Sequence, residues 1–260
     1  MKSSKVMRGL AVAFGLVFTL ISTSAQAQVK TKKNMKKILF VVTSHDKKGS
    51  TGQPTGYYLS EVSHPWDVLV NAGYEIDFVS PLGGNAPVDG FNLEDPINKK
   101  FWENAVYHKK IENTLKPSQV NPNDYVAIHY AGGHGAMWDL PQNKEIAAIA
   151  AKIYENNGVV SAVCHGPAGL VDIKLSNGKY LIDGKKVNGF TNEEEVAVGL
   201  EKVVPFLLED KMIELGGIFE KSGLWQEHAV ADKRVVTGQN PQSAHAVGVA
   251  VLKELKALKK

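Results

Sequence analysis

The chain has 260 residues, of which 43% are hydrophobic, and this is enough for one sizeable core. Its 30 Lys and Arg face 27 Asp and Glu, but Lys2, Lys5 and Arg8 lie in the first 27 residues, so the remainder is formally neutral. This balance excludes the strongly basic surface that binds nucleic acid or anionic membranes. The single cysteine excludes an internal disulfide.

The N-terminal segment has the pattern of a signal peptide. Its basic residues precede an apolar run over 10–21, and Ala25-Gln26-Ala27 provides a cleavage site of small residues. An uncleaved membrane anchor is the alternative, but the apolar run is short for a membrane span. We expect no membrane attachment after cleavage. We therefore expect an exported protein, periplasmic or secreted. The predicted organisation is a signal peptide over 1–27, a linker over 28–36 and a single domain over 37–260.

The first part of this domain predicts a βαβ unit. Residues 37–43 form a continuous apolar run, which is typical of a parallel strand covered on both faces. Apolar residues then recur at helical spacing over 57–72, and Gly73 is placed to end the helix. The alternating segment 75–79 predicts a second strand. Residues 83–122 are rich in Gly, Pro, Asn and Asp and predict an insertion with a short helix, either a lid or a dimer surface.

The second part continues the alternation of strands and helices. Residues 125–130 predict a third strand that runs into a glycine turn, and residues 159–163 predict a fourth. This order predicts an α/β sandwich with a largely parallel sheet. The other expected elements are a helix over 143–156 ended by Gly158, a hairpin over 180–190 that turns at Asp183-Gly184, a helix capped by Thr191 or Asn192, a helical segment over 205–215, a strand pair over 228–237 that turns at Asp232-Lys233, and a closing helix over 241–258.

Cys164 directly follows the fourth strand, and His165 and four small residues follow it. A buried strand that stops at a nucleophile and turns at once into small residues resembles a nucleophile elbow, where a strained turn exposes the side chain. A helix start beyond the turn presents N–H groups and positive dipole to a thiolate. We therefore predict a reactive thiol; the alternative is a small buried hydrophobe.

A catalytic thiol needs a base and, for carbonyl chemistry, donors for an oxyanion. His165 adjoins Cys164, although neighbouring side chains in an elbow point in different directions. The main-chain N–H of His165 is the expected first oxyanion donor, because it belongs to the residue after the nucleophile. Gly132 and Gly133, in the glycine turn, are expected to supply the second donor. The alternative is that these glycines only form a tight turn.

Two carboxylates are candidate partners, and no metal site is expected. Glu61 lies mid-helix among apolar neighbours near the expected crevice, although a solvated helix face also explains it. Glu195 lies in a first helical turn, where dipole compensation is the alternative. His129 and His134 lack the helical i, i+4 spacing of zinc proteases. The chain has no P-loop and no dinucleotide fingerprint, so no cofactor is expected.

These residues belong to segments that resemble the ThiJ/PfpI superfamily, the class I glutamine amidotransferase-like proteins. The resemblance is strongest to the heat-shock-protein branch with glyoxalase III activity, and it covers essentially the whole predicted domain. The segments are Ser60-Glu61-Val62-Ser63-His64-Pro65-Trp66, Gly133-His134-Gly135 with Trp138-Asp139-Leu140-Pro141, Ala162-Val163-Cys164-His165-Gly166-Pro167, Gly189-Phe190-Thr191 through Glu195, and Val236-Thr237-Gly238-Gln239-Asn240-Pro241 with Ser243-Ala244-His245.

The resemblance implies a flavodoxin-like three-layer sandwich, usually a homodimer, with a Cys-His-Glu triad. The nucleophile falls on Cys164, the histidine on His165 and the acid on Glu195. The helix carboxylate that hydrogen-bonds the thiol falls on Glu61. Because the residues before Glu195 are also acidic, Glu194 is an alternative for the acid.

The branch converts methylglyoxal to D-lactate without glutathione or metal, and its members also act as holding chaperones. By resemblance, we expect a glutathione-independent lyase for small 2-oxoaldehydes. In this hypothesis Cys164 adds to the aldehyde, and His165 or Glu61 moves a proton from C1 to C2. The alternatives are a cysteine amidase or peptidase that forms an acyl-thiol, and a stress chaperone or thiol sensor without enzymatic activity.

Overall fold

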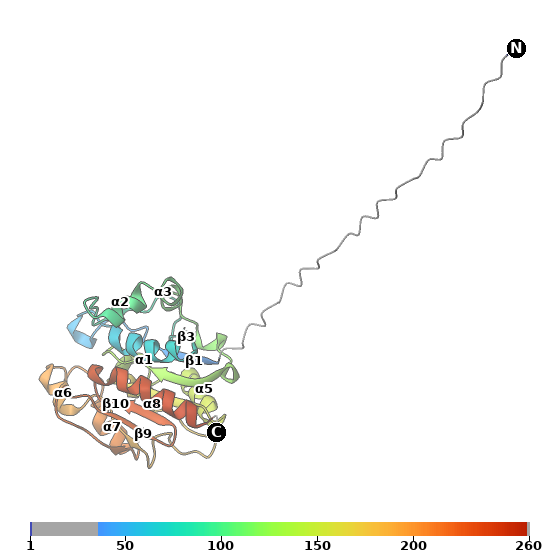
Figure 1. Cartoon of the computed structure of the whole chain (residues 1–260). Helices are drawn as coiled ribbons and strands as arrows, with labels where there is room; N and C mark the ends of the chain where they lie inside the picture. Colours follow the sequence, from blue (N-terminus) through green and yellow to red (C-terminus); the bar gives the residue numbers. More distant parts are fainter. Residues whose placement is uncertain (2–35, 259–260) are drawn as a thin grey trace. The chain divides into compact units, whose positions relative to one another are not determined.

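The computed structural model describes Met1 and residues 36–258. A six-stranded sheet in the order β3-β1-β5-β6-β10-β9 forms its centre (Figure 1). Neighbouring strands are parallel except for the edge pair β10 and β9. The predicted flavodoxin-like sandwich with a largely parallel sheet is thus confirmed. The strands are β1 (Lys37–Val41), β3 (Glu75–Val79), β5 (Tyr125–Tyr130), β6 (Val159–Val163), β9 (Ala229–Asp232) and β10 (Val235–Gly238).

Helices cover the sheet, and the apolar runs of its inner strands follow from this cover. In β1 the last four residues are completely buried, as a strand with helices on both faces requires. Helices α1 (Leu59–Asn71) and α8 (Ala244–Ala257) pack against each other, and α8 also contacts β6 and β10 (Figure 1). Helix α5 (Lys144–Glu155) contacts β5 and β6.

Shorter elements connect and surround this core. The paired short strands are β2 (Tyr57–Tyr58) with β4 (Val88–Asp89) and β7 (Lys186–Val187) with β8 (Ile218–Phe219). The remaining α-helices are α2 (Pro96–Trp102), α3 (Ala105–Glu112), α4 (Ala136–Asp139), α6 (Asn192–Ala197) and α7 (Leu208–Glu214). The 3-10 helices are η1 (Gly49–Thr51), η2 (Pro117–Gln119), η3 (Pro122–Asp124), η4 (Gly166–Leu170) and η5 (Pro241–Ser243).

Three local predictions were wrong. The predicted hairpin over 180–190 does not form, because β7 pairs in parallel with the distant β8. Asn157, with φ 64°, takes the left-handed position after α5, whereas Gly158 lies too close to the main chain of Ile153 to admit a Cβ. The turn after Cys164 leads into the 3-10 helix η4 rather than into an α-helix.

The predicted insertion over 83–122 packs against the rest of the described chain. Helix α2 contacts α1, and α3 contacts β3. The strand β4 pairs with β2 next to the start of α1. Apart from Met1 and Lys36, the predicted signal peptide over 1–27 and linker over 28–36 lie outside the described residues. Among the helices of the described residues, none has both the length and the apolarity to cross a membrane.

Candidate active site

Cys164 stands at a strained turn at the end of β6. Its φ of 59° is left-handed, which is costly for a residue with a side chain. Two main-chain hydrogen bonds hold it there: its N–H donates to the Gly238 carbonyl at 2.9 Å, and its carbonyl accepts from the Phe190 N–H at 2.8 Å. The predicted nucleophile elbow is therefore present in the fold.

The Cys164 side chain borders a cavity of about 320 Å³ at the carboxyl end of the sheet. Only 3% of the residue is exposed, so the thiol lies at the buried end of this cavity. The lining residues are Lys48, Gln53, Tyr58, Asp89, Gly133, His134, Cys164, His165, Phe190, Val198, Leu200, Trp225 and Pro241. One wall is therefore apolar and aromatic, and another carries the ion pair of Lys48 and Asp89.

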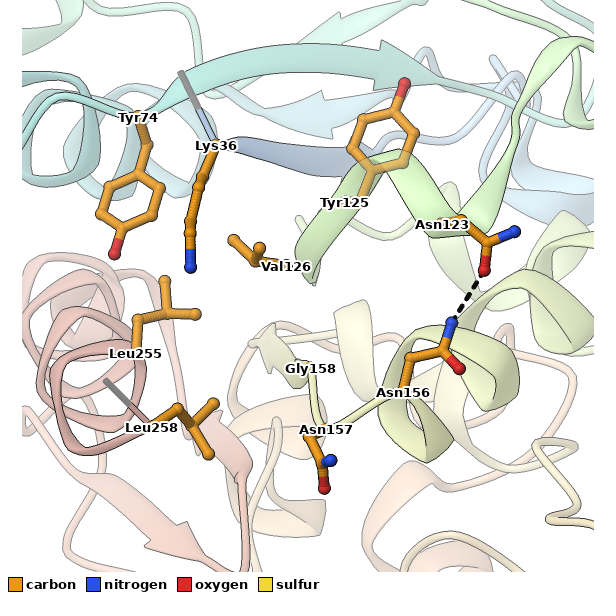
Figure 2. A pocket seen from close by; sticks show the side chains of 10 residues that line it. All are labelled: Lys36, Tyr74, Asn123, Tyr125, Val126, Asn156, Asn157, Gly158, Leu255 and Leu258. Carbon is orange, nitrogen blue, oxygen red and sulfur yellow. Dashed lines mark hydrogen bonds between the residues drawn. The ribbon is translucent and has the colours of Figure 1, made fainter. Parts of the chain in front are cut away.

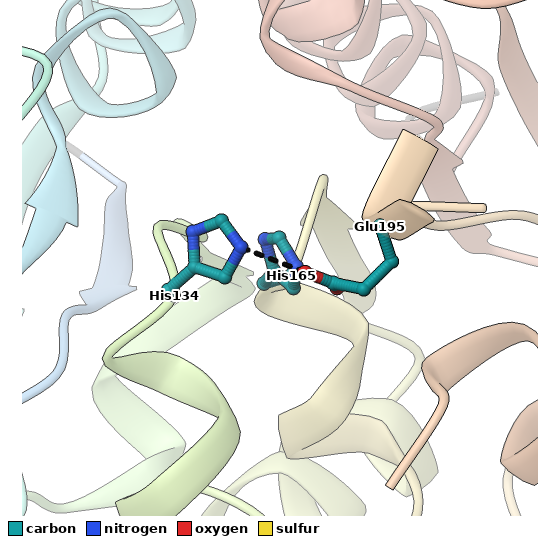
Figure 3. A group of neighbouring side chains, drawn as sticks. All are labelled: His134, His165 and Glu195. Carbon is teal, nitrogen blue, oxygen red and sulfur yellow. Dashed lines mark hydrogen bonds and ion pairs between the residues drawn. The ribbon is translucent and has the colours of Figure 1, made fainter. Parts of the chain in front are cut away.

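His165 connects the thiol to Glu195. Its Nδ1 lies 3.4 Å from Cys164 Sγ, and its Nε2 lies 2.8 Å from Glu195 Oε2. The second carboxylate oxygen of Glu195 lies 2.9 Å from Nε2 of His134, whose ring is 4.1 Å from that of His165 between centroids (Figure 3). The structure thus brings together the predicted Cys164, His165 and Glu195 and adds His134.

These contacts determine which nitrogen of His165 carries the proton. Burial and the neighbouring His134 lower the pKa of His165 to about 4, so the ring is neutral at pH 7. Burial alone would raise the pKa of Glu195, but the hydrogen bonds from His134 and His165 lower it to about 2. An ionised carboxylate only accepts, so Nε2 of His165 is the donor and Nδ1 presents a lone pair to the thiol.

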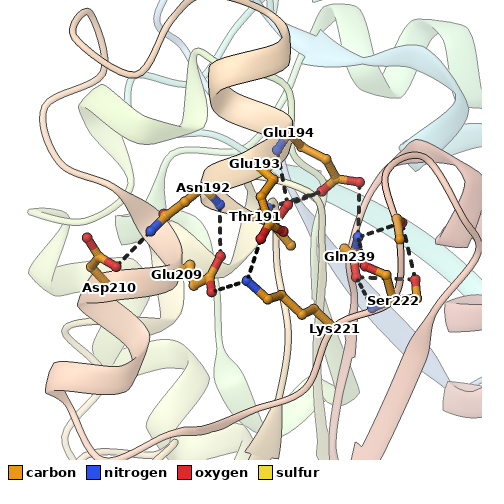
Figure 4. Close-up of polar contacts among 10 residues, drawn as sticks. Thr191, Asn192, Glu193, Glu194, Glu209, Asp210, Lys221, Ser222 and Gln239 are labelled. Atoms are coloured by element: carbon orange, nitrogen blue, oxygen red, sulfur yellow. Dashed lines mark hydrogen bonds and ion pairs between the residues drawn. The ribbon is translucent and has the colours of Figure 1, made fainter.

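Glu194 has a different role, although it is adjacent to Glu195. Thr191 caps α6, and the Glu194 side chain returns to the N–H and hydroxyl of Thr191 at 3.1 Å (Figure 4). Its other oxygen accepts from Gln239 Nε2, Asn240 Nδ2 and the main-chain N–H of Trp225. The carboxylate that reaches His165 is therefore that of Glu195, and Glu194 joins the surrounding loops.

Glu61 lies in the first turn of α1, because that helix begins at Leu59, and it is completely buried. Its Oε2 accepts from the Gly132 N–H at 2.7 Å, and a Cβ at Gly132 would lie 2.6 Å from the same oxygen. Its Oε1 has no hydrogen-bond partner among the described residues. Burial raises the pKa of Glu61 to about 8, although the Cys164 thiol and the Gly132 N–H act against that rise. Glu61 thus faces the thiol, as the resemblance implied.

The main-chain N–H groups predicted as oxyanion donors have different acceptors in the structure. Burial, and to a lesser degree Glu61, raises the pKa of the Cys164 thiol well above its ordinary value, whereas hydrogen bonds from the main-chain N–H groups of Gly133 and His165 lower it. The Gly132 N–H instead donates to Glu61. The donors directed at sulfur are therefore those of Gly133 and His165. The low thiol pKa that a redox sensor requires is not found.

His134, Phe190 and Trp225 complete the site, and none of them was among the predicted site residues. Phe190 stacks on His165 at 4.3 Å between centroids and contacts Trp225 at 5.6 Å. The main-chain N–H of Trp225, a residue with φ 58°, is held by Glu194. The sequence signal for His134 was its place in the glycine turn, whereas nothing local indicated Trp225.

His129 and His134, the two histidines considered as metal ligands, have different partners in the structure. His134, His165 and Glu195 have ligand atoms within 4.8 Å of one another, so among the described residues this group could hold a metal ion. Both histidine Nε2 atoms are, however, occupied by hydrogen bonds to Glu195. His129 contacts Ser161 and the main chain of Glu61 instead.

A second cavity, of about 280 Å³, lies at the opposite end of the sheet (Figure 2). Its lining includes Lys36 before β1, Tyr125 at the start of β5 and Gly158 before β6, all at amino ends of strands. It contains none of the predicted site residues. The chemistry-bearing groups therefore belong to the cavity at Cys164.

Comparisons with known proteins agree with this geometry. The chain is 35% identical over 236 residues to the glutathione-independent glyoxalase HSP31 of Saccharomyces cerevisiae, covering 85% of this chain and 98% of the relative. It is 37% identical over 222 residues to glyoxalase 3 of Candida albicans, covering 81% and 94%. The crystal structure of Candida albicans glyoxalase III matches with a TM-score of 0.78 at 32% identity, covering 85% of this chain and 98% of that one. The 24 kDa Rapid Encystment Protein of Francisella tularensis matches with a TM-score of 0.82 at 41% identity, covering 85% and 99%.

The prediction of export is contradicted by these comparisons. The relatives that are named glyoxalases are fungal proteins, matched over nearly their whole length, and the similarity to them gives no support to a periplasmic or secreted protein. The prediction rested on a short basic and apolar pattern, which reports only local charge and hydrophobicity. Apart from Met1, that pattern lies outside the described residues.

A family model extends the likeness across most of the described chain. The model of the DJ-1/PfpI family matches residues 54–254, a range that contains Glu61, the glycine turn, the elbow and Glu195. The resemblance to the ThiJ/PfpI superfamily is thus confirmed. By this match and by the identity to its relatives, the chain belongs to the DJ-1/PfpI family.

Proposed function

We propose that this protein is a glutathione-independent glyoxalase of the glyoxalase III type, which converts methylglyoxal to D-lactate and other small 2-oxoaldehydes to 2-hydroxy acids. One observation carries the proposal: the thiol of Cys164, at the end of a 320 Å³ cavity, is in contact with a neutral His165 that Glu195 orients. The names of the relatives, glutathione-independent glyoxalase and glyoxalase 3, support the same activity.

The first step is addition of sulfur to the aldehyde carbon. As the C–S bond forms, the S–H proton passes to Nδ1 of His165, 3.4 Å away, and Glu195 stabilises the resulting imidazolium. The main-chain N–H groups of Gly133 and His165, which already favour charge on the sulfur, hold the developing oxyanion. Return of the proton to this oxygen gives a thiohemiacetal.

The second step moves a proton from C1 to C2. A carboxyl with a pKa of about 8 can accept and return a proton near neutral pH, so we assign this role to Glu61. Its Oε1 is the unpartnered oxygen, while Oε2 is held by Gly132. Loss of the C1 proton with protonation of the C2 carbonyl oxygen gives an enediol, and protonation at C2 with loss of the C1 hydroxyl proton gives a thioester of the 2-hydroxy acid. C1 is oxidised as C2 is reduced, so no external oxidant is needed.

The third step is hydrolysis of the thioester. Neutral His165 is placed to take a proton from the attacking water, and the same two N–H groups hold the second oxyanion. The C–S bond breaks, the 2-hydroxy acid leaves, and the sulfur regains its proton. Glutathione has no part in the scheme, because the thiol of Cys164 takes its place.

The test is lactate formation by the purified full chain in glutathione-free buffer. With methylglyoxal as substrate, we expect D-lactate from the wild type and none from Cys164→Ala. Lactate formation at the wild-type rate by Cys164→Ala would refute the scheme. A wild type that forms no lactate but cleaves a panel of amides or peptides would instead support the acyl-thiol alternative.

The homodimer implied by the resemblance is part of the proposal and is tested separately. Light scattering coupled to size exclusion would give twice the mass of the chain for a dimer. A chaperone activity that survives Cys164→Ala while lactate formation disappears would show a second function independent of the thiol.

A further inference from the structure

Helix α1 contains a proline one turn after Glu61. Pro65 has no main-chain N–H, so it cannot close the helical hydrogen bond to the carbonyl of Glu61 four residues earlier. Glu61 is completely buried, so bulk solvent does not contact this carbonyl, and a buried carbonyl needs a donor from elsewhere. The helical turn that carries the Glu61 carboxyl therefore lacks one main-chain hydrogen bond, because Pro65 cannot donate it.

His129 supplies the donor that Pro65 lacks. Its Nε2 lies 3.1 Å from the Glu61 carbonyl oxygen. A carbonyl only accepts, so Nε2 carries the proton, and Nδ1 accepts from the Ser161 hydroxyl at 3.0 Å. The Ile128 carbonyl, 3.3 Å from the same hydroxyl, is a more distant acceptor that competes for its single proton. Burial lowers the pKa of His129 to about 4, which agrees with a neutral ring in this tautomer.

The contact joins three elements that each carry part of the site. Ser161 lies on β6, which ends at Val163 directly before Cys164, and it is the direct neighbour of His129 in the register of β5 and β6. Three residues after His129, the N–H of Gly132 holds Oε2 of Glu61. The same stretch of chain thus holds Glu61 at its main chain and at its side chain. Oε1 is the oxygen of this carboxyl that has no hydrogen-bond partner among the described residues.

We infer that His129 is a positioning residue, which replaces the hydrogen bond lost at Pro65 and thereby holds the carboxyl of Glu61 against the thiol of Cys164. The inference rests on the proposed function, because it gives the proton-transfer group of that scheme its place. It also stands on contacts that exist without any substrate. Its consequences can therefore be measured on the thiol as well as on the reaction.

Two variants separate positioning from simple packing. His129→Leu keeps an apolar side chain of similar size and removes the donor, whereas His129→Gln retains an N–H donor. For His129→Leu we expect kcat/KM for methylglyoxal to fall by about 10- to 100-fold, mostly in kcat, because the proton-transfer group is displaced from the substrate. The alkylation rate of Cys164 as a function of pH should shift towards the profile of Glu61→Gln. His129→Gln should lie closer to the wild type in both measurements.

Pro65→Ala provides the rescue. It restores a main-chain N–H at the position that the Glu61 carbonyl needs, so His129→Leu combined with Pro65→Ala should recover most of the lost kcat and the wild-type alkylation profile. Pro65→Ala alone should remain close to the wild type. If the double variant stays as impaired as His129→Leu, or if His129→Leu keeps the wild-type profile, the inference is wrong. Should His129→Leu fail to fold, the double variant and His129→Gln decide the question.

Alkylation can be measured whether or not the protein has glyoxalase activity. It reports on Cys164 alone, because this is the only cysteine of the chain. If the wild type forms no lactate, the proposed function fails, and the alkylation profiles still decide whether His129 positions Glu61. If lactate forms but the profiles of His129→Leu and the wild type coincide, only the positioning role fails.

Discussion

Nε2 of His134 lies 2.9 Å from Oε1 of Glu195, so the carboxylate that orients His165 is shared between two imidazole rings. Both rings donate to it, and together they lower the pKa of Glu195 to about 2 although burial acts in the opposite direction. His134 also lowers the pKa of His165. His134 therefore affects His165, the base of the proposed mechanism, in two ways: through the shared Glu195 and directly through the pKa of the ring.

Removing His134 should move the acid limb of the pH profile. In His134→Ala the group that lowers the pKa of His165 is lost, and more water reaches the ring, so we expect this pKa to rise from about 4. A base with a higher pKa is protonated at higher pH, so the acid limb of kcat/KM should move to higher pH. We also expect a loss of roughly 10-fold at pH 7. His134→Gln, which keeps a donor, is the control, and an unchanged acid limb would contradict the assignment.

Glu195 and Glu194 should differ in what their loss affects. Glu195→Gln replaces one of the two accepting oxygens by an NH2 donor, so the side chain can no longer accept from both His134 and His165 and fix the tautomer of His165. We expect kcat to fall by about 100-fold or more with little change in stability.

Glu194 accepts from five donors, so Glu194→Gln leaves several of them unpaired, and we expect a loss of about 2–4 kcal/mol in the free energy of unfolding. Urea denaturation and single-substrate kinetics on the two variants distinguish these outcomes. A larger loss of kcat in the Glu194 variant would exchange the two assignments.

The buried Glu61 should make the protein less stable as the pH rises. Burial raises its pKa from the ordinary 4.5 to about 8, so between these pH values the folded state binds more protons than the unfolded state. The free energy of unfolding therefore falls over this interval, and Glu61→Gln abolishes that part of the fall.

His129 and His165 act in the opposite direction between about pH 4 and 6.5, because burial lowers the pKa of both. Their effects are present in both proteins and cancel in the comparison. Melting temperatures of the wild type and Glu61→Gln measured from pH 5 to 8 should diverge with rising pH, to the benefit of the variant. Parallel curves would mean that Glu61 is ionised throughout.

Cys164 should react slowly with alkylating reagents at neutral pH. Burial raises the pKa of its thiol, so the thiolate fraction and the rate with iodoacetamide should rise about 10-fold per pH unit between pH 7 and 9. Cys164→Ala, which has no other thiol, gives the blank. A rate that is already constant from pH 7 upwards would reveal an ionised thiol and favour the sensor interpretation.

The sheet could be predicted because its inner strands are covered on both faces. Such strands must be largely apolar, and the inner strands at 125–130 and 159–163 begin and end where the sequence predicted. The edge strand at 75–79 also has its predicted bounds, but the signal there was alternation. The hairpin at 180–190 failed for a different reason. Gly184 does turn, with φ 65°, but the residues after it pair with Ile218 and Phe219. A local turn signal carries no information about such a distant partner.

Within the candidate site, the residues alone predicted the position that carries a chemically unusual side chain. Cys164 was found from its place after a strand, but Glu61 and Glu195 were carried by resemblance, since sequence alone does not bring them to the sulfur. Glu194 was kept as an alternative acid, although the spacing from Thr191 to Glu194 is that of a capping box and favours a structural role. His134 and Trp225 approach His165 only through the packing of separate loops.

The two main-chain hydrogen bonds of Cys164 have a consequence for biosynthesis. Their partners are Phe190 and Gly238, which follow the cysteine by 26 and 74 residues in the sequence and are therefore synthesised later. A nascent chain that ends before Gly238 lacks one of the two anchors that hold the strained turn. The elbow at Cys164 is therefore completed only when most of the chain has been synthesised.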